Sequence, residues 1–178
     1  MFKGDVGKGV KIIDFGSATF MDDVDYDYLQ TRPYRAPEVT LGCHFDFAID
    51  MWSIGCILYE LVTNKVLFNY QTVQENMAKA LAINRLNNFD ILSDANKKKK
   101  FMLNNNLLFI SNDAGRGSVE DLEVVIPKND FDLVLDLKKN FCDLALIDFI
   151  QRCLVIDPAL RISVDTALDH EFLKRNLN

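Results

Sequence analysis

Residues 31–38 read TRPYRAPE, and three further motifs stand around them in order along the chain. The turn Asp14-Phe15-Gly16 lies 22 residues before Ala36, IDMWSIGC occupies residues 49–56, and DPALRIS occupies residues 157–163. A three-residue motif occurs often by chance, so none of them alone decides the architecture. The common order and spacing of the four motifs make them, taken together, a specific signature of one fold.

The composition is that of one ordinary globular domain. The chain has 178 residues, of which 49% are hydrophobic and 26% are charged, and its formal net charge is −6. This length and composition predict a single domain with a hydrophobic core. The acidic balance argues against a protein that coats DNA, because such a surface carries an excess of basic residues.

Cysteine spacing and hydropathy predict the compartment. The four cysteines form no C-x-x-C pair, so we expect reduced thiols in an intracellular protein rather than disulfides or a zinc site. No secretory leader follows Met1, and the apolar residues 49–62 fall short of the roughly 20 residues of a membrane span. We therefore expect a soluble protein that is neither secreted nor bound to a membrane.

Hydrophobic periodicity predicts a mainly helical chain. Residues 49–62 are apolar almost all round, which is typical of a helix buried inside a domain. The capping box Thr72-Val73-Gln74-Glu75 begins a second helix. A third helix follows Phe141 and is stopped by Asp157-Pro158. Ser163 can cap a last helix that carries Ala167, Leu168 and Phe172.

The predicted β content is small. Val10–Ile13 reads as a short strand that leads into a turn, and the long loop 17–47 is of the kind that usually serves function. Leu107–Ile110 and Leu122–Ile126 favour a hairpin within a polar stretch. The lysine run at residues 97–100 indicates a solvated surface, with a nuclear address as the alternative.

With these motifs, the chain resembles the eukaryotic protein kinases from the residues before Asp14 to its end. The resemblance covers only their C-terminal lobe, which implies a mainly α fold with a short β element at the start and an inserted segment. It divides the single kinase domain, residues 1–178, into four parts. Residues 1–47 hold the metal-binding turn and the activation segment, and residues 48–86 form a helical core. Residues 87–140 are the insert, and residues 141–178 form the C-terminal helices.

Several stretches are similar to one branch of that family, which contains mitogen-activated, cyclin-dependent and dual-specificity tyrosine-regulated kinases. The segment Arg32–Arg35 marks the branch, and the residues around Gly16 and Asp50 narrow it to dual-specificity, homeodomain-interacting and splicing kinases. Residues 57–68 and the insert are most similar to the spliceosomal pre-mRNA-processing serine/threonine kinases. That similarity implies substrates among splicing factors and a nuclear location, with a cytoplasmic one as the alternative.

The resemblance implies roles for residues of the first two motifs. Asp14 matches the carboxylate that binds Mg²⁺ at the ATP phosphates, and Phe15 matches the ring whose packing separates active from inactive states. Gly16 completes that turn. Thr31 and Arg35 match residues of the substrate site, where Arg35 implies a preference for proline after the target residue.

Three further residues match structural features of the family. Glu38 and Arg161 match a buried ion pair, in which removal of one partner would leave an uncompensated charge. Asp50 matches a helix carboxylate that holds the backbone of the catalytic loop by hydrogen bonds.

Tyr28 matches a regulatory tyrosine. In the kinases that the chain resembles, this tyrosine is phosphorylated and docks on two arginines, here Arg32 and Arg35, which orders the loop. Guanidinium groups bind phosphate well because their forked N–H donors match its oxygens. The alternative is an unmodified aromatic ring that packs on the lobe.

Several kinase parts do not occur in this sequence. It contains no glycine-rich strand pair, no strand lysine with its helix glutamate and no His-Arg-Asp-x-x-x-x-Asn loop, so no catalytic residue is assigned. The catalytic aspartate and asparagine are expected upstream of Met1. One hypothesis is therefore that the chain is part of a serine/threonine kinase that uses ATP and Mg²⁺. In this hypothesis the chain lacks the N-terminal lobe and is inactive alone. The other is a truncated kinase relic that only binds proteins; direct binding of nucleic acid or membrane is not expected.

Overall fold

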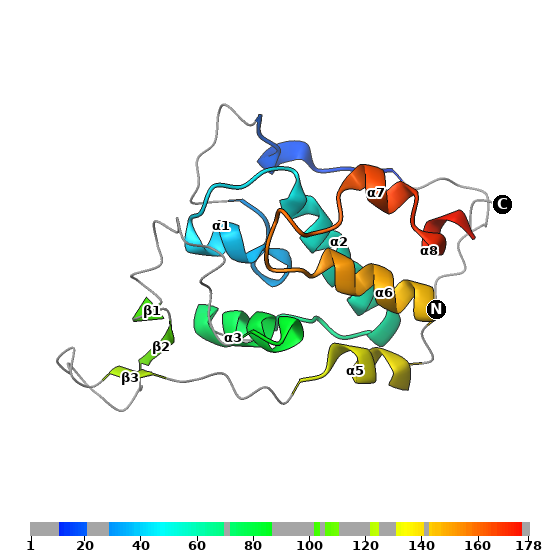
Figure 1. Ribbon diagram of the computed structural model, residues 1–178. Coiled ribbons are helices and arrows are strands. Elements are labelled where there is room, and N and C mark those ends of the chain that lie inside the picture. Colours follow the sequence, from blue (N-terminus) through cyan, green and yellow to red (C-terminus); the bar gives the residue numbers. More distant parts are fainter. Residues whose placement is uncertain are drawn as a thin grey trace.

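Helix α2 (Ala48–Thr63) runs through the middle of the computed structural model, and the other helices lie around it (Figure 1). The structure describes residues 11–20, 29–69, 72–86, 102–103, 106–110, 122–124, 131–140 and 143–175. Two 3₁₀ turns, η1 (Phe15–Ser17) and η2 (Arg32–Tyr34), precede α2, and so does α1 (Pro37–Leu41). The helices that follow α2 are α3 (Val73–Asn84), α5 (Leu133–Lys139), α6 (Leu144–Cys153), α7 (Val164–Leu168) and α8 (Glu171–Lys174).

The contact between α2 and α6 depends on a glycine. A Cβ atom added at Gly55 would lie 2.8 Å from the Cβ of Cys153 and 2.9 Å from the Cγ of Leu154. Carbon atoms do not approach that closely, so any larger side chain at position 55 would push the two helices apart. The predicted helix over residues 49–62 is thus confirmed, and its glycine sets how near α6 can come.

The prediction that this helix is buried all round is wrong. Trp52, Cys56 and Tyr59 are buried, but Ile57 is 46% exposed and Leu61 is 75% exposed. These exposed positions share one side of α2, because residues three and four apart on a helix are neighbours. Periodicity reports the hydrophobic character of each side of a helix, whereas burial also needs another element to cover that side.

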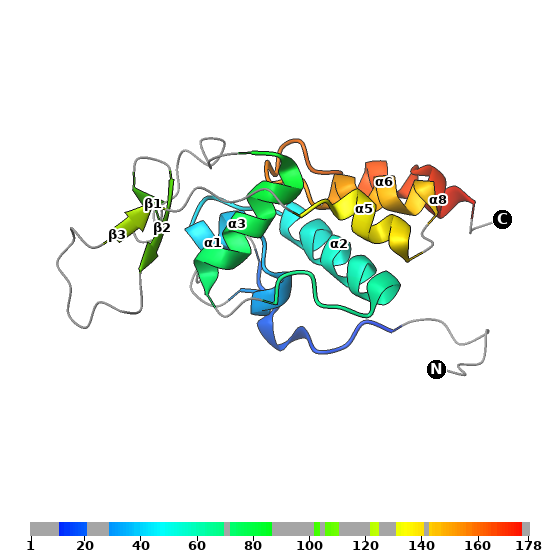
Figure 2. The ribbon, with the colours of Figure 1, turned by 90° about the horizontal axis from the view of Figure 1, so that it is seen from below.

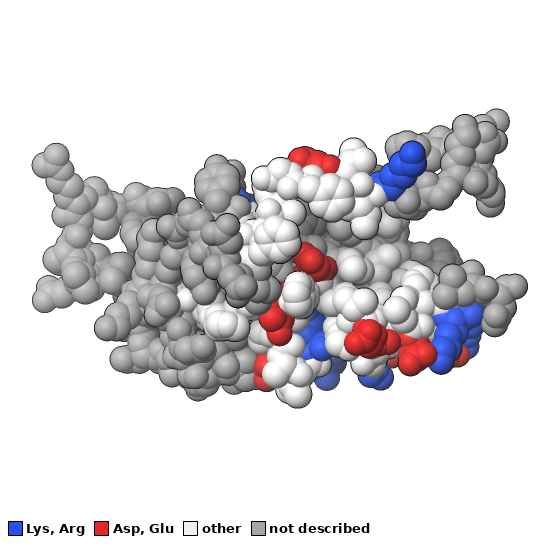
Figure 3. All heavy atoms as spheres, turned by 90° about the horizontal axis from the view of Figure 1, so that it is seen from above, with Lys and Arg blue, Asp and Glu red and all other residues white. Residues whose placement is uncertain are grey.

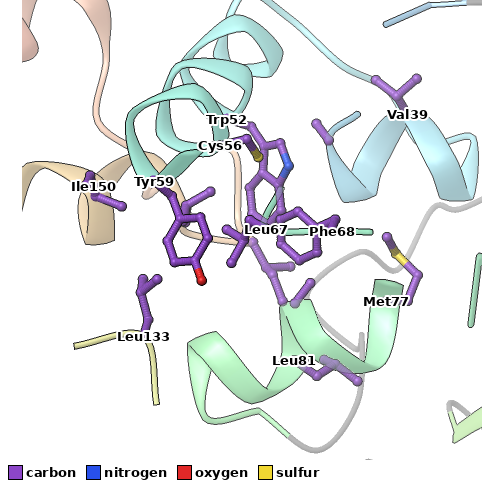
Figure 4. Close-up of a cluster of buried hydrophobic side chains, with 14 of the residues drawn as sticks. Val39, Trp52, Cys56, Tyr59, Leu67, Phe68, Met77, Leu81, Leu133 and Ile150 are labelled. Atoms are coloured by element: carbon purple, nitrogen blue, oxygen red, sulfur yellow. The ribbon is translucent and has the colours of Figure 1, made fainter. Parts of the chain in front are cut away.

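The core joins α2, α3, α5 and α6. Figure 4 shows Trp52 and Tyr59 projecting from α2 toward Leu67 and Phe68, with Met77 and others rising from α3. The Trp52 and Phe68 rings stack with centroids 5.5 Å apart. Each fully buried side chain of this size contributes about 1.5–3 kcal/mol relative to an exposed one.

Side-chain caps begin several helices, as the sequence predicts for two of them. Thr72 accepts a hydrogen bond from the backbone N–H of Glu75 and completes the capping box of α3, and Ser163 accepts one from Thr166 at the start of α7. The last helix is not continuous, however. It ends at Leu168, and His170 caps a separate helix, α8, that carries Phe172.

The other helix boundaries also differ from expectation. Helix α6 ends at Cys153, ahead of the Asp157-Pro158 pair that was expected to stop it. Helices α1 and α5 have no counterpart in the periodicity analysis, because each has fewer than eight residues and shows too few turns for a clear pattern.

The predicted hairpin is present. Strands β2 (Asn106–Ile110) and β3 (Leu122–Val124) pair antiparallel, and β1 (Met102–Leu103) adds a third strand to β2. Figure 2 shows these strands at one end of the molecule, beyond α3, and β2 contacts that helix.

The prediction of a strand at Val10–Ile13 is wrong for the residues that the structure describes. Lys11–Ile13 form irregular, exposed backbone, and Val10 lies outside the described residues. A strand needs a neighbouring strand to receive its hydrogen bonds, and the described strands pair only with one another. The predicted short β element at the start is therefore not found in this part of the chain.

Three cysteines lie in the described part of the chain, and all three are buried free thiols: Cys43, Cys56 and Cys153. Burial raises the pKa of the Cys153 thiol to about 12 and raises that of Cys56 further, so both thiols stay protonated and unreactive. Cys142 and the lysine run lie outside the described residues. Within the described ranges, no helix has the length and apolar character needed to cross a membrane.

Candidate functional site

The buried ion pair predicted between Glu38 and Arg161 is present. The two Nη atoms of Arg161 donate to the two carboxylate oxygens of Glu38 at 2.6 and 2.9 Å, and neither side chain is exposed. The remaining three N–H groups of Arg161 donate to the carbonyls of Val155, Ala48 and Ile156. Since a guanidinium group has five N–H donors, all of them have an acceptor. The pair therefore locks α1 to the start of α2 and to the loop ahead of α7.

Arg35 holds the backbone just before η2. Its Nε donates to the carbonyl of Leu29 at 2.8 Å, and its Nη2 donates to the carbonyl of Gln30 at 2.8 Å. Gln30 has a φ of 58°, in the left-handed region that residues other than glycine rarely adopt. The guanidinium group thus fixes both carbonyls, at the position for which the sequence analysis expects a substrate site.

A chain of hydrogen bonds ties this segment to α2. Gln30 Nε2 donates to Ser53 Oγ at 2.8 Å, and Ser53 Oγ donates to the carbonyl of Tyr34 at 2.9 Å. The Tyr34 hydroxyl donates to a carboxylate oxygen of Glu60 at 2.7 Å. This hydrogen bond and partial burial raise the pKa of Tyr34, because ionisation would remove the donor and place two negative charges together. Residues 29–36 are therefore bound along α2; they are named here the substrate segment because the sequence analysis expects the substrate site among them.

A pocket opens beside the substrate segment. It has a volume of about 610 Å³ and lies between η2 and α3, with Arg32 and Arg35 on one wall and Phe68 and Met77 among its apolar residues. Thr31 and Arg32 are exposed, and the guanidinium group of Arg32 has no hydrogen-bond or ion-pair partner among the residues that the structure describes. The arrangement offers positive charge next to an apolar surface, which suits a peptide.

Charges of both signs also lie side by side among the described residues. On the face that Figure 3 shows, acidic and basic side chains lie close together along one edge of the described surface. In α8 and directly after it, Lys174 pairs with Asp169 at 3.0 Å, and Arg175 lies 3.6 Å from a carboxylate oxygen of Asp143.

The Asp14-Phe15-Gly16 turn is exposed throughout. Asp14 has a φ of 65° and directly precedes η1, and its carboxylate has no hydrogen-bond or ion-pair partner in the described part of the chain. Phe15 is 67% exposed, and a Cβ at Gly16 would lie 3.5 Å from a carboxylate oxygen of Asp14. Asp14 is a hard oxygen ligand without a competing partner, which fits Mg²⁺, an ion that takes one or two carboxylates plus phosphate oxygens. The described residues hold no group of three or more metal-ligating side chains.

Asp50 lies on the first turn of α2, where the helix dipole favours a negative charge. Its surroundings raise the pKa of this carboxyl by desolvation although the side chain reaches solvent. No described residue gives it a hydrogen bond, so the structure brings it together with no other predicted site residue. Tyr28 lies outside the described residues, and its docking on Arg32 and Arg35 stays a prediction.

Sequence reasoning missed Gln30, Ser53 and the Tyr34–Glu60 contact. Gln30 precedes Thr31 directly, so its place beside the motif was the one available signal. A lone glutamine in a loop has no periodicity or spacing, and its partners on α2 lie 19 and 23 residues further along the chain.

The sequence of this chain is similar to those of known protein kinases. The family model described as "Protein kinase domain" matches residues 1–173. Dual specificity tyrosine-phosphorylation-regulated kinase 4 of Homo sapiens is 36% identical over 170 residues, which are 95% of this chain and 31% of that protein. Dual specificity tyrosine-phosphorylation-regulated kinase 2 of Drosophila melanogaster is 39% identical over 167 residues, which are 93% of this chain and 22% of that protein.

A third relative is named as a serine/threonine-protein kinase. Serine/threonine-protein kinase prpf4B of Dictyostelium discoideum is 34% identical over 183 aligned residues, which cover 93% of this chain and 22% of that protein. The chain thus spans no more than 31% of the length of these three relatives.

Proposed function

Because the chain belongs to the protein kinase family, we propose that it is part of an ATP-dependent kinase that phosphorylates serine or threonine in other proteins. The observation that carries this proposal is the substrate segment, which Arg35 and α2 hold in one conformation beside the buried Glu38–Arg161 pair. Phosphoryl transfer depends on positioning and on electrostatic stabilisation, so a rigid platform for the target peptide is the part that this chain supplies.

The platform favours proline after the target residue. The carbonyl of Gln30 already accepts from Arg35, so it offers little to an incoming backbone N–H. Proline has no backbone N–H and loses nothing there, whereas any other residue would leave a donor without an acceptor. Thr31 and Arg35 are the substrate-site residues of this proposal.

Asp14 is the residue that would hold Mg²⁺. The ion supplies positive charge that neutralises the transferring phosphate, and the exposed carboxylate of Asp14 is free to face it. Phosphorylated Tyr28 would bind Arg32 and Arg35 and order the loop ahead of the substrate segment, since a phosphate matches two guanidinium groups.

Splicing factors are the substrate class that we propose within the branch. Support comes from the similarity of residues 57–68 and of the insert to splicing kinases, and a relative named prpf4B matches 93% of the chain. A nuclear location belongs to the same proposal. The relatives named as dual specificity kinases are at least as similar, so the kinase reaction stands independently of this substrate class.

The test uses a complete kinase that joins this chain to an N-terminal lobe and a catalytic loop. The purified protein should phosphorylate a peptide that contains Ser-Pro, and Asp14→Ala should abolish incorporation while the urea midpoint of unfolding stays within error. A complete protein that binds ATP and folds but transfers no phosphate to any peptide would favour the alternative, a protein-binding relic.

A further inference from the structure

The side chain of Asn84 makes three hydrogen bonds, two of which join α3 to the residues that follow α6. Asn84 is the last residue of α3 and is half-buried. Its Nδ2 donates to the carbonyl of Ala80 at 3.0 Å and to that of Leu154 at 2.9 Å. Its Oδ1 accepts from the backbone N–H of Ile156 at 3.1 Å. A carbonyl only accepts and a backbone N–H only donates, so these partners fix which way the amide group points.

Residues 154–156 also hold Arg161. The carbonyl of Val155 accepts from Arg161 Nε at 2.8 Å, and the carbonyl of Ile156 accepts from Arg161 Nη2 at 3.1 Å. Asn84 and Arg161 therefore bind alternate backbone groups of the same three residues. A shift of these residues away from one of the two side chains also displaces the partners of the other.

A single peptide unit carries the connection. The C=O of Val155 and the N–H of Ile156 belong to one peptide plane, whose atoms do not rotate against each other. Asn84 holds this plane by its N–H, and Arg161 Nε binds its carbonyl. Without the Asn84 side chain the plane loses one of its two holds. It would then turn more easily, and the carbonyl would turn with it, away from Arg161.

Arg161 passes this constraint on to the substrate segment. Its two Nη atoms bind the carboxylate of Glu38, which stands two residues after Ala36, the last residue of that segment. The pocket beside the segment has α3 as its other wall, with Met77 among the lining residues. Asn84 thus connects the two walls of the pocket, α3 directly and the substrate segment through Arg161 and Glu38.

We propose that Asn84 is a positioning residue for the target peptide. Its side chain fixes the peptide plane that holds Arg161, and so sets how the substrate segment lies opposite α3 across the pocket. The proposal rests on the kinase function proposed above and names a residue that positions its peptide site.

The first experiment uses the chain itself and needs no catalysis. Hydrogen exchange measured by NMR follows two protons. The amide hydrogen of Ile156 reports its bond to Asn84, and the Nε hydrogen of Arg161 reports its bond to the Val155 carbonyl. In Asn84→Ala, both protons should exchange about fivefold faster or more. Helix α3 is retained in this variant, because alanine has the highest helix propensity.

Asn140→Ala is the matched control. Its side chain also donates to the carbonyl four residues earlier, that of Asp136, as Asn84 does to Ala80. Asn140 is exposed and stands at the end of α5, so the variant removes the same local bond at a helix end. Both protons should exchange in this variant as they do in the parent chain.

The second experiment measures KM for a peptide that contains Ser-Pro, in the complete kinase. Asn84→Ala should raise this KM about fivefold and leave kcat unchanged, because a displaced wall weakens the binding of substrate and transition state alike. Loss of folded protein alone gives another pattern, since fewer active molecules lower the apparent kcat and leave KM as it was. Asn140→Ala should change neither value.

Asn84→Asp is a second variant. It keeps an acceptor for the N–H of Ile156 but sets a carboxylate oxygen against the carbonyl of Leu154, where the parent has a donor. The two oxygens repel each other, so residues 154–156 are displaced in this variant too. The KM for the peptide should therefore rise, again with kcat unchanged.

Three results would overturn the proposal. Faster exchange at Ile156 with unchanged exchange at Arg161 would mean that the peptide plane transmits nothing. An unchanged peptide KM in both Asn84 variants would show that the pocket does not depend on this side chain. Equal effects in Asn140→Ala would assign the changes to the loss of any bond at a helix end.

Failure of the kinase function gives a different result. A complete parent protein that phosphorylates no peptide contradicts the proposed function. The exchange experiment on the chain then still decides whether Asn84 holds Arg161 in place.

Discussion

Replacing Glu38 by alanine should destabilise the chain by about 3 kcal/mol, the lower end of the range for breaking a buried ion pair. The change removes both carboxylate acceptors of Arg161 and leaves a positive charge with no exposed atoms on its side chain. Three backbone carbonyls still accept from this guanidinium group, which is why the loss is expected at the lower end.

Glu75→Ala is the matched control. It also removes a hydrogen-bonded glutamate at the start of a helix, but the bonds of Glu75 to Thr72 lie at the surface. Losing one half of a capping box should cost about 1 kcal/mol or less. The two variants therefore differ in burial of the carboxylate rather than in residue type.

Urea denaturation at neutral pH, followed by circular dichroism, gives the free energy of unfolding of each variant. The double variant Glu38→Ala, Arg161→Met should lose less than the sum of the single losses, because no charge is then left uncompensated. Equal midpoint shifts for Glu38→Ala and Glu75→Ala would refute the reasoning, since the buried pair would then contribute no more than a surface cap.

Four further predictions concern activity, association, pH and regulation. The chain alone should incorporate no phosphate from radiolabelled ATP into a basic protein substrate, because the catalytic loop does not occur in its sequence; steady incorporation would contradict this. Light scattering should show self-association as concentration rises, and Leu61→Lys should reduce it, since Leu61 exposes an apolar side of α2; a monodisperse parent monomer would count against this. Burial opposes ionisation of Asp148, yet hydrogen bonds from His170 and Arg152 hold its pKa below the usual 3.8. Asp148→Asn should therefore lower the urea midpoint at pH 7, and the midpoints of variant and parent should become equal below pH 3.8. In the complete kinase, Tyr28→Phe should lower the phosphorylation rate without changing the urea midpoint, and mass spectrometry that finds Tyr28 unmodified in the active protein would exclude the switch.

The direction in which the stability contributed by Asp148 changes with pH follows from the linkage between proton binding and folding. A carboxyl group whose pKa is lower in the folded than in the unfolded chain stabilises the fold above its unfolded pKa. That contribution disappears as pH falls through the folded pKa, because the group is then protonated in both states. Asp148 is about half exposed, so the effect is a small shift of the midpoint.

Local patterns in the sequence were sufficient to predict α2, the capping box of α3, the Ser163 cap and the β2–β3 hairpin. Each of these depends on residues close together in the chain, whose side chains meet because a helix or strand has a fixed repeat. The Glu38–Arg161 pair, 123 residues apart, was predictable for another reason, because the four motifs together resemble one family.

Two features depend on tertiary packing, namely which residues of α2 are buried and the backbone conformation of Gln30. Ile57 and Leu61 look as apolar in sequence as Cys56 and Tyr59, but only the latter pair meets another element. Nothing local in Gln30 predicts a left-handed backbone or bonds to Ile49 and Ser53, because those partners come near only once α2 has docked. Hydrophobic and capping patterns depend on residues that are neighbours in the sequence. The three side-chain hydrogen bonds of Gln30 join residues that come together only in the folded chain.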